Sequence, residues 1–193
     1  MKVSSVIAGA SAALVAFQAA LYASHGEADL LRPPGAHGEK DFASRCVKCG
    51  KCMEACPYIA IKPARDVAGA AVGTPMIDAR AQACRVCEDF PCVEACPTNA
   101  LRDIETRSDV KMGVAVIDED LCIAFQGMRC EVCYRTCPLI DEAIVIDYRL
   151  REGDAIHSVF APVIDEDKCV GCGLCVERCV VSEPRVAIRI ASD

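Results

Sequence analysis

The chain has 193 residues and a formal net charge of −7, from 28 acidic and 21 basic side chains. Without a basic stripe, an acidic chain is not typical of a nucleic-acid-binding protein, so we expect no nucleic-acid partner. Hydrophobic residues make up 53% of the chain, but sixteen of them are cysteines, only 5% of residues are aromatic and tryptophan is absent. Because the apolar core is thin, we expect the cysteines to cross-link the fold, as disulfides or as metal ligands.

The N-terminal segment differs from the rest of the chain. Residues 3–23 carry no charge and are rich in alanine, which predicts a secretory signal or a weakly hydrophobic membrane anchor over residues 1–30. Its serines and Gln18 make it a poor lipid-spanning helix, which favours the signal. Residues 31–40 contain Pro33, Pro34 and two glycines and predict a turn-rich linker, so we expect the folded region over residues 41–193.

The cysteines form a fourfold internal repeat that uses every one of them. Two sets have the spacing CxxCxxCxxxC, one set has four residues between its second and third cysteines, and one has seven between its first and second. The members are Cys46, Cys49, Cys52 and Cys56 (set one); Cys84, Cys87, Cys92 and Cys96 (set two); Cys122, Cys130, Cys133 and Cys137 (set three); and Cys169, Cys172, Cys175 and Cys179 (set four).

This spacing favours iron–sulfur clusters over disulfides or zinc. An exported chain could form disulfides, but cysteines only two residues apart rarely have suitable geometry to pair with each other. Zinc sites draw two ligands from each of two knuckles and need no third cysteine or proline. In the bacterial ferredoxin run CxxCxxCxxxCP, three cysteines bind one [4Fe–4S] cluster and the fourth binds a second cluster. We therefore predict four [4Fe–4S] clusters, with all sixteen cysteines as ligands.

Short secondary-structure elements are expected around the cysteines. The three residues before each fourth cysteine amount to about one helical turn, and Pro57, Pro97 and Pro138 then end that turn in three of the sets. Alternating or continuous apolar runs predict strands. These strands cover residues 113–118, 143–150, 157–165 and 186–191, and the second and third form a hairpin. The predicted fold is α+β, a ferredoxin-like polyferredoxin with two bacterial 2[4Fe–4S] modules.

The pairing of the sets is open to two arrangements. Because sets one and four share the regular spacing, we expect them to exchange fourth ligands, and sets two and three to do the same, in a nested arrangement. Sequential pairing, of set one with set two and of set three with set four, is the alternative. The 25 to 31 residues that separate successive sets permit either.

Several motifs resemble those of a known family. The stretches "LRPPGA", "CVKCGKCMEACPY", "CIAFQGMRCEVCYRTCPLIDEAI" and "CVGCGLCVERC" resemble the MauM/NapG family of ferredoxin-type proteins, and NapG members most. The resemblance runs from about Leu31 to Ile190. It implies a periplasmic iron–sulfur protein at the periplasmic face of the inner membrane, which is an electron-transfer subunit and not an enzyme.

The same resemblance implies the partners. A NapH-like polytopic membrane protein would oxidise quinol, and electrons would pass on to periplasmic nitrate reductase or to a cytochrome c intermediary. A MauM-like role in methylamine utilisation, or service as the iron–sulfur subunit of another periplasmic oxidoreductase, is the alternative. Family members carry a twin-arginine signal, whereas this chain begins "MKVSSVIAG", so we hypothesise that the Arg-Arg pair is encoded upstream of Met1. No constellation of catalytic side chains is evident, since the three histidines are scattered.

Overall fold

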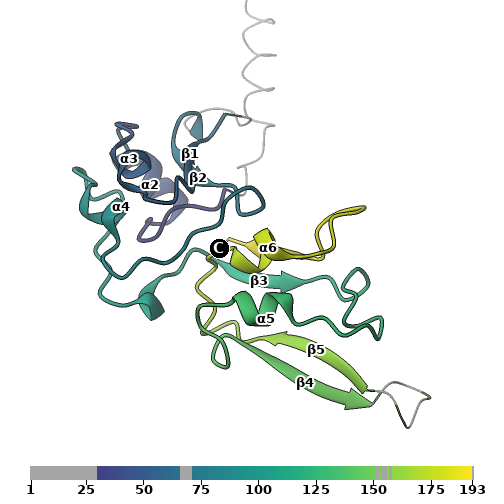
Figure 1. The fold of residues 1–193 in the computed structure, drawn as a ribbon. Helices are drawn as coiled ribbons and strands as arrows, with labels where there is room; N and C mark the ends of the chain where they lie inside the picture. Colours follow the sequence, from purple (N-terminus) through teal and green to yellow (C-terminus); the bar gives the residue numbers. More distant parts are fainter. Residues whose placement is uncertain (1–29, 66–70, 151–152, 154–155, 157, 193) are drawn as a thin grey trace, which may run out of the picture.

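The computed structural model describes residues 30–65, 71–150, 153, 156 and 158–192. The predicted signal or anchor over residues 1–30 lies outside these residues, apart from Leu30. In the described part, no helix is both long and apolar enough to cross a membrane. Figure 1 shows an N-terminal part, purple to teal, beside a C-terminal part, green to yellow. We name residues 31–112 module one and residues 113–191 module two.

The described part of module one contains three short α-helices, one small strand pair and, near its end, a 3-10 helix. The helices are α2 (Glu39–Arg45), α3 (Lys51–Ala55) and α4 (Pro91–Glu94). Strands β1 (Ile61–Pro63) and β2 (Pro75–Ile77) pair antiparallel between set one and set two, with Ile61 opposite Ile77. A single antiparallel bridge, between Ala36 and Leu101, joins the two ends of the module.

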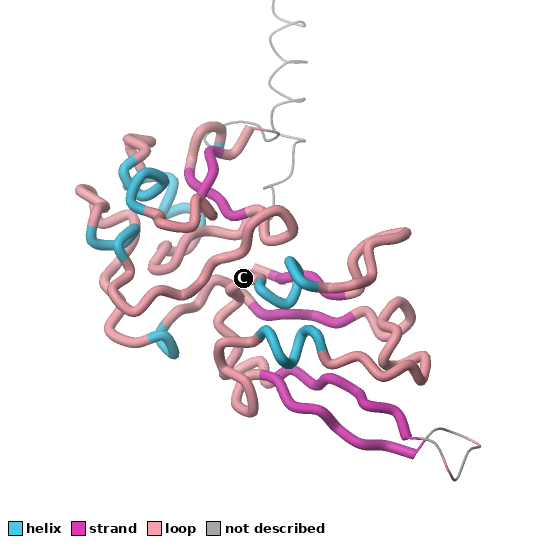
Figure 2. The backbone as a smooth tube through the Cα atoms, in the orientation of Figure 1, coloured by secondary structure: helices cyan, strands magenta, loops and turns pink. Residues whose placement is uncertain are grey.

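Module two follows the same plan with longer strands. After the 3-10 helix η2 (Arg107–Asp109), its elements are β3 (Val114–Ile117), α5 (Val132–Thr136), β4 (Ile144–Leu150), β5 (Ser158–Ile164), α6 (Leu174–Arg178) and β6 (Ile188–Ala191). Strands β4 and β5 form the inner hairpin, and β3 pairs antiparallel with β6 at the outside. Figure 2 shows these two ribbons in magenta. All four strands predicted from sequence are confirmed, as is the hairpin.

The main apolar cluster extends across both modules, and a smaller cluster around Val176 and Ile188 lies in module two. Phe42, Ile77 and Val110 of module one pack in the same cluster as Val170 and Leu174 of module two. Buried cysteines from sets one, two and four belong to this cluster as well. The core is therefore built around the cysteine loops, as the scarcity of aromatic residues suggested.

The stretch expected to be a linker is packed instead. Leu31, Arg32, Pro33 and Pro34 are buried, and the amide of Ile77 donates a hydrogen bond of 2.8 Å to the carbonyl of Leu31. Prolines and Gly35, with φ of 79°, do form a turn, as predicted. The prediction of a linker over residues 31–40 is wrong because this turn lies against β2 and supplies one half of the outer bridge.

Arg32 anchors the same stretch. Its guanidinium donates hydrogen bonds of 2.8 Å to Glu39 and 2.7 Å to the hydroxyl of Thr74, and it lies 4.7 Å from the ring centroid of Phe42. A buried guanidinium with an ionic partner and an aromatic face is well satisfied. Module one thus begins near residue 31, and helix α2 begins at Glu39.

Candidate iron–sulfur cluster sites

The sixteen cysteines line four cavities, and each cavity takes three cysteines from one set and one from another. Cavity one holds Cys46, Cys49, Cys52 and Cys96; cavity two Cys84, Cys87, Cys92 and Cys56; cavity three Cys122, Cys130, Cys133 and Cys179; and cavity four Cys169, Cys172, Cys175 and Cys137. Cys133 also borders cavity four. Each cavity is partly open to solvent.

The arrangement corrects the nested prediction. Set one exchanges its fourth cysteine with set two, and set three with set four, so sequential pairing is the observed one. The physical reason is the hairpin between the sets of each module. Because β1–β2 and β4–β5 return the chain to where it left, the cysteine run after the hairpin lies beside the run before it. The similar spacing of sets one and four carries no information about pairing.

The loops of sets one, two and four each curl at two positions that take the left-handed conformation. In set one these are Lys48 and Gly50, with φ of 56° and 80°. Set two has Val86 at 49° and Phe90 at 40°, and set four has two glycines at the equivalent places. Such angles are costly for β-branched and aromatic residues, and strain of this kind gathers at functional sites. Within the described ranges, set three lacks this pair and turns at Gly127 in its longer spacer.

A single helical turn then directs the fourth cysteine away from its own loop. Helices α3, α4, α5 and α6 each begin just before the third cysteine of a set and end just before the fourth, or one residue earlier for α4. This confirms the predicted turn. It explains why Cys56 reaches cavity two and Cys179 reaches cavity three.

The thiols lie where they resist losing a proton on their own. Burial, with smaller contributions from neighbouring cysteines, raises the pKa of Cys52 to about 11 and those of Cys92 and Cys133 to about 12. Burial likewise raises the pKa of Cys172 to about 12. Four neutral thiols around an apolar cavity stabilise one another only weakly. A cationic iron centre inverts this preference, because a coordinating thiol is deprotonated outright.

Backbone amides point at several of the sulfurs. The N–H groups of Ala60, Val86 and Ala115 each donate to a cysteine sulfur at 3.4 Å, on Cys56, Cys84 and Cys169 respectively. At Cys96 burial would raise the pKa, but hydrogen bonds from Leu101, Thr98 and Ala100 outweigh it and lower the pKa. Such donors stabilise negative charge on sulfur and tune the reduction potential of a bound cluster.

The cavities fit a cluster better than either simpler alternative. All sixteen cysteines, every one of them described, are free thiols. Among the described residues, no group of three or more histidine, cysteine, aspartate or glutamate side chains converges closely enough to hold a single metal ion. Zinc would need its sulfurs about 2.3 Å from one point. Four thiols that line one shared cavity suit a group with several metal atoms, and they fit an iron–sulfur cluster.

Some residues that shape the cavities were not evident from sequence. Leu101 and Phe42 line cavity one although they lie outside the cysteine runs. No periodic pattern marks them, since each sits in a short or irregular segment. Ile144 and Ile190 line cavity four, and the alternation of their strands does place them on one face.

Comparison with known proteins agrees with this geometry. A family model described as a 4Fe-4S dicluster domain matches twice, over residues 45–100 and 127–182. Each match lies within one module. The first spans all the cysteines of sets one and two, and the second spans those of sets three and four apart from Cys122. No solved structure matches the chain significantly.

Several curated proteins are similar over most of the chain. The ferredoxin-type protein NapG of Escherichia coli (strain K12) is 46% identical over 160 residues, which cover 82% of this chain and 69% of that protein. The methylamine utilization ferredoxin-type protein MauM of Methylobacillus flagellatus is 45% identical, covering 84% of this chain and 68% of that protein. The ferredoxin-type protein NapF of Escherichia coli is 27% identical, covering 79% and 81%.

Proposed function

The chain belongs to the family of ferredoxin-type proteins that includes NapG and MauM, and we propose that it relays electrons through four [4Fe–4S] clusters. The observation that carries the proposal is the set of four separate cavities, each lined by cysteines from two paired sets. Three ligands from one run and one from its partner is the pattern of a two-cluster ferredoxin. In this proposal all sixteen cysteines are cluster ligands.

The chemistry supplied by such clusters is one-electron transfer, and the protein holds them in place. Its loops would present backbone N–H groups to the sulfurs, and apolar walls such as Phe90 and Ile77 at cavity two would keep water away. We propose that the chain is not itself an enzyme. Chemistry at a substrate would take place on its partners.

We propose that the donor is a NapH-like polytopic membrane protein that oxidises quinol, and that the acceptor is periplasmic nitrate reductase or a cytochrome c intermediary. The relay would then work in the periplasm, at the face of the inner membrane. Support comes from the 46% identity to a NapG protein over most of the chain. The comparable identity to a MauM protein favours a second candidate, the same relay serving methylamine utilisation.

Metal analysis tests the cluster proposal directly. Anaerobically purified protein should contain about sixteen iron and sixteen sulfide atoms per chain, four of each for every cubane. Reduction with dithionite should produce the low-temperature EPR signals of magnetically interacting [4Fe–4S] centres. A preparation with about eight iron atoms would contradict four clusters, and one without sulfide would contradict clusters altogether.

Electron delivery tests the choice of partners. Membranes containing the NapH-like protein and reduced quinol should reduce the purified protein, and addition of periplasmic nitrate reductase with nitrate should reoxidise it. Reduction by the membranes without reoxidation by the nitrate reductase, directly or through a cytochrome c, would favour the methylamine role. No reduction by quinol in any combination would contradict the relay.

A further inference from the structure

A glutamate recurs at one position of the cysteine repeat. Glu54, Glu94 and Glu177 each stand two residues after the third cysteine of their set, in α3, α4 and α6. Glu54 and Glu94 are exposed, whereas the side chain of Glu177 is only 13% exposed. Of these three equivalent glutamates, only the one in set four is shielded from solvent.

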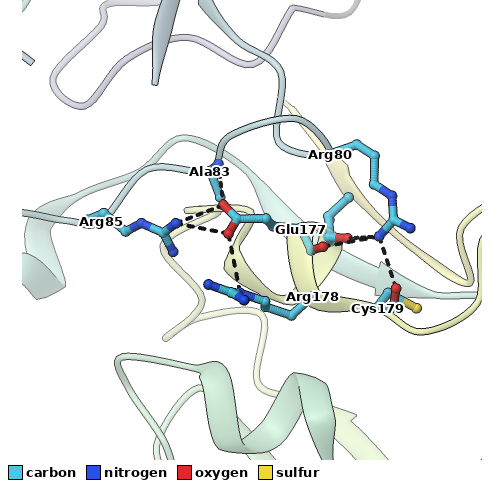
Figure 3. Close-up of polar contacts among 7 residues, drawn as sticks. Arg80, Ala83, Arg85, Glu177, Arg178 and Cys179 are labelled. Carbon is cyan, nitrogen blue, oxygen red and sulfur yellow. Dashed lines mark hydrogen bonds and ion pairs between the residues drawn. The ribbon is translucent and has the colours of Figure 1, made fainter. Parts of the chain in front are cut away.

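Glu177 is partly buried against module one. Its carboxylate accepts a hydrogen bond of 2.7 Å from the amide of Ala83 and bonds of 2.9 and 3.1 Å from the guanidinium of Arg85. Arg178 approaches the same carboxylate at 3.3 Å. Figure 3 shows the carboxylate between these groups, with Ala83 and Arg85 on one side. A charged, bifurcated and partly buried contact of this kind is among the stronger hydrogen-bonded pairs.

A second contact from module one holds the end of the same helix. The guanidinium of Arg80 donates to the carbonyl oxygens of Val176, Glu177 and Cys179 at 2.9, 3.2 and 3.0 Å (Figure 3). The carbonyl of Val176 also accepts a bond of 3.4 Å from the amide of Cys179, which caps the helix. A cation is favourable at a helix C-terminus, where the last carbonyls gather. Helix α6 is thus fixed to module one at its glutamate and at its last turn.

The fixed helix lies where cavities two and four approach each other. The amide of Cys84, in set two, donates a hydrogen bond of 3.0 Å to the carbonyl of Cys172, in set four. Cys84 directly follows Ala83, whose amide binds Glu177. The two cysteine loops are therefore joined backbone to backbone.

We propose that Glu177 is a positioning residue that fixes cavity two against cavity four, so that electrons cross between the modules at the hydrogen bond from Cys84 to Cys172. This rests on the proposed relay function. Each crossing would oxidise one site by one electron and reduce the other, with no bond broken. The cavities then follow the order one, two, four, three, which puts cavity one and cavity three at the two ends.

Hydrogen exchange tests the junction without reference to activity. In the cluster-loaded protein, Glu177→Ala should speed amide exchange in the peptide containing Ala83 and Cys84 by about ten- to a hundredfold, the effect of losing a charged hydrogen-bond network. Glu177→Gln keeps an oxygen acceptor for the Ala83 amide but loses the charge that pairs with Arg85, so its exchange should be intermediate. Glu94→Ala removes the same residue at the same repeat position in α4 and should leave exchange unchanged.

Electron redistribution tests the path itself. After addition of one electron per molecule, freeze-quench EPR should show that the electron is shared rapidly between the two modules, both in the native protein and in Glu94→Ala. In Glu177→Ala that fast sharing should be lost, with iron content unchanged, and Glu177→Gln should recover part of it. Unchanged exchange and unchanged sharing in Glu177→Ala would overturn the inference.

A native protein that accepts no electrons would overturn the relay function, whereas the exchange result would still decide the role of Glu177. If Glu177→Ala loses iron, Glu177→Gln serves as the test in its place. Native amide exchange and native electron sharing in Glu177→Gln would then overturn the proposal.

Discussion

Single backbone positions decide whether the cysteine loops can close. Gly50 and Gly173 occupy equivalent places, just before α3 and α6, with φ of 80° and 82°. Their surroundings differ. A Cβ on Gly50 would meet nothing within 4 Å, whereas one on Gly173 would lie 2.5 Å from the Cβ of Ala79, in module one. The pair therefore separates the cost of the left-handed conformation from the cost of crowding between modules.

Alanine at these two glycines should have unequal effects. Gly50→Ala should lower the free energy of unfolding by about 1 to 2 kcal/mol, the strain of an alanine at positive φ. Gly173→Ala should cost a further 1 to 3 kcal/mol or so, because the extra carbon overpacks the contact with Ala79. Thermal melting of the two cluster-loaded variants measures the difference. Equal losses would show that the two modules do not touch at this glycine.

The inner hairpins are the elements that bring the cysteine sets together. Strand β4 shows this most clearly, because its first residue, Ile144, is 2% exposed and lines cavity four, whereas its neighbour Val145 is 41% exposed. Successive side chains on a strand point to opposite faces. One face of the hairpin therefore covers the cysteines and the other faces solvent.

Truncation on the two faces should distinguish them. Ile144→Ala should lower the free energy of unfolding by about 2 to 5 kcal/mol and admit water to cavity four, because a large buried side chain is removed. The neighbouring change Val145→Ala should alter stability by less than about 0.5 kcal/mol. Denaturation curves measure stability, and the rate of iron loss in air measures access. Equal iron loss in both variants would mean that the hairpin does not shield the cavity.

At the scale of the whole molecule, the core is continuous with the cysteine loops. Sets one, two and four contribute buried cysteines to the main apolar cluster, and few large side chains surround them. With so little apolar area, the bonds between cysteine and iron would supply much of the folding free energy. Neutral, crowded thiols with raised pKa values would not replace them.

Removal of iron should therefore unfold the protein. Treatment with a chelator and an oxidant under denaturant-free conditions should abolish the cooperative melting transition and much of the far-ultraviolet circular dichroism. Reconstitution with iron and sulfide should restore both. Retention of a cooperative transition by the iron-free protein would contradict a fold that depends on its clusters.

Much of this architecture follows from local sequence. The spacing of the cysteines predicts one helical turn before each fourth cysteine, and apolar alternation predicts β3, β4, β5 and β6, because both signals depend only on neighbours along the chain. Strands β1 and β2 were not predicted, since three residues each are too few to show a period. The same limit hid the packing of residues 31–36 against module one.

What the sequence by itself determined is the presence of four runs of four cysteines, whose spacing favours iron and sulfur as their partners. Only the tertiary structure decided which runs share a cavity, because that depends on where the hairpins return the chain, and similar spacing in sets one and four says nothing about distance in space. It also decided which of three equivalent glutamates is shielded from solvent. Glu177 contacts the amide of Ala83 and the guanidinium of Arg85 because the second module packs against the first, whereas Glu54 and Glu94 are exposed.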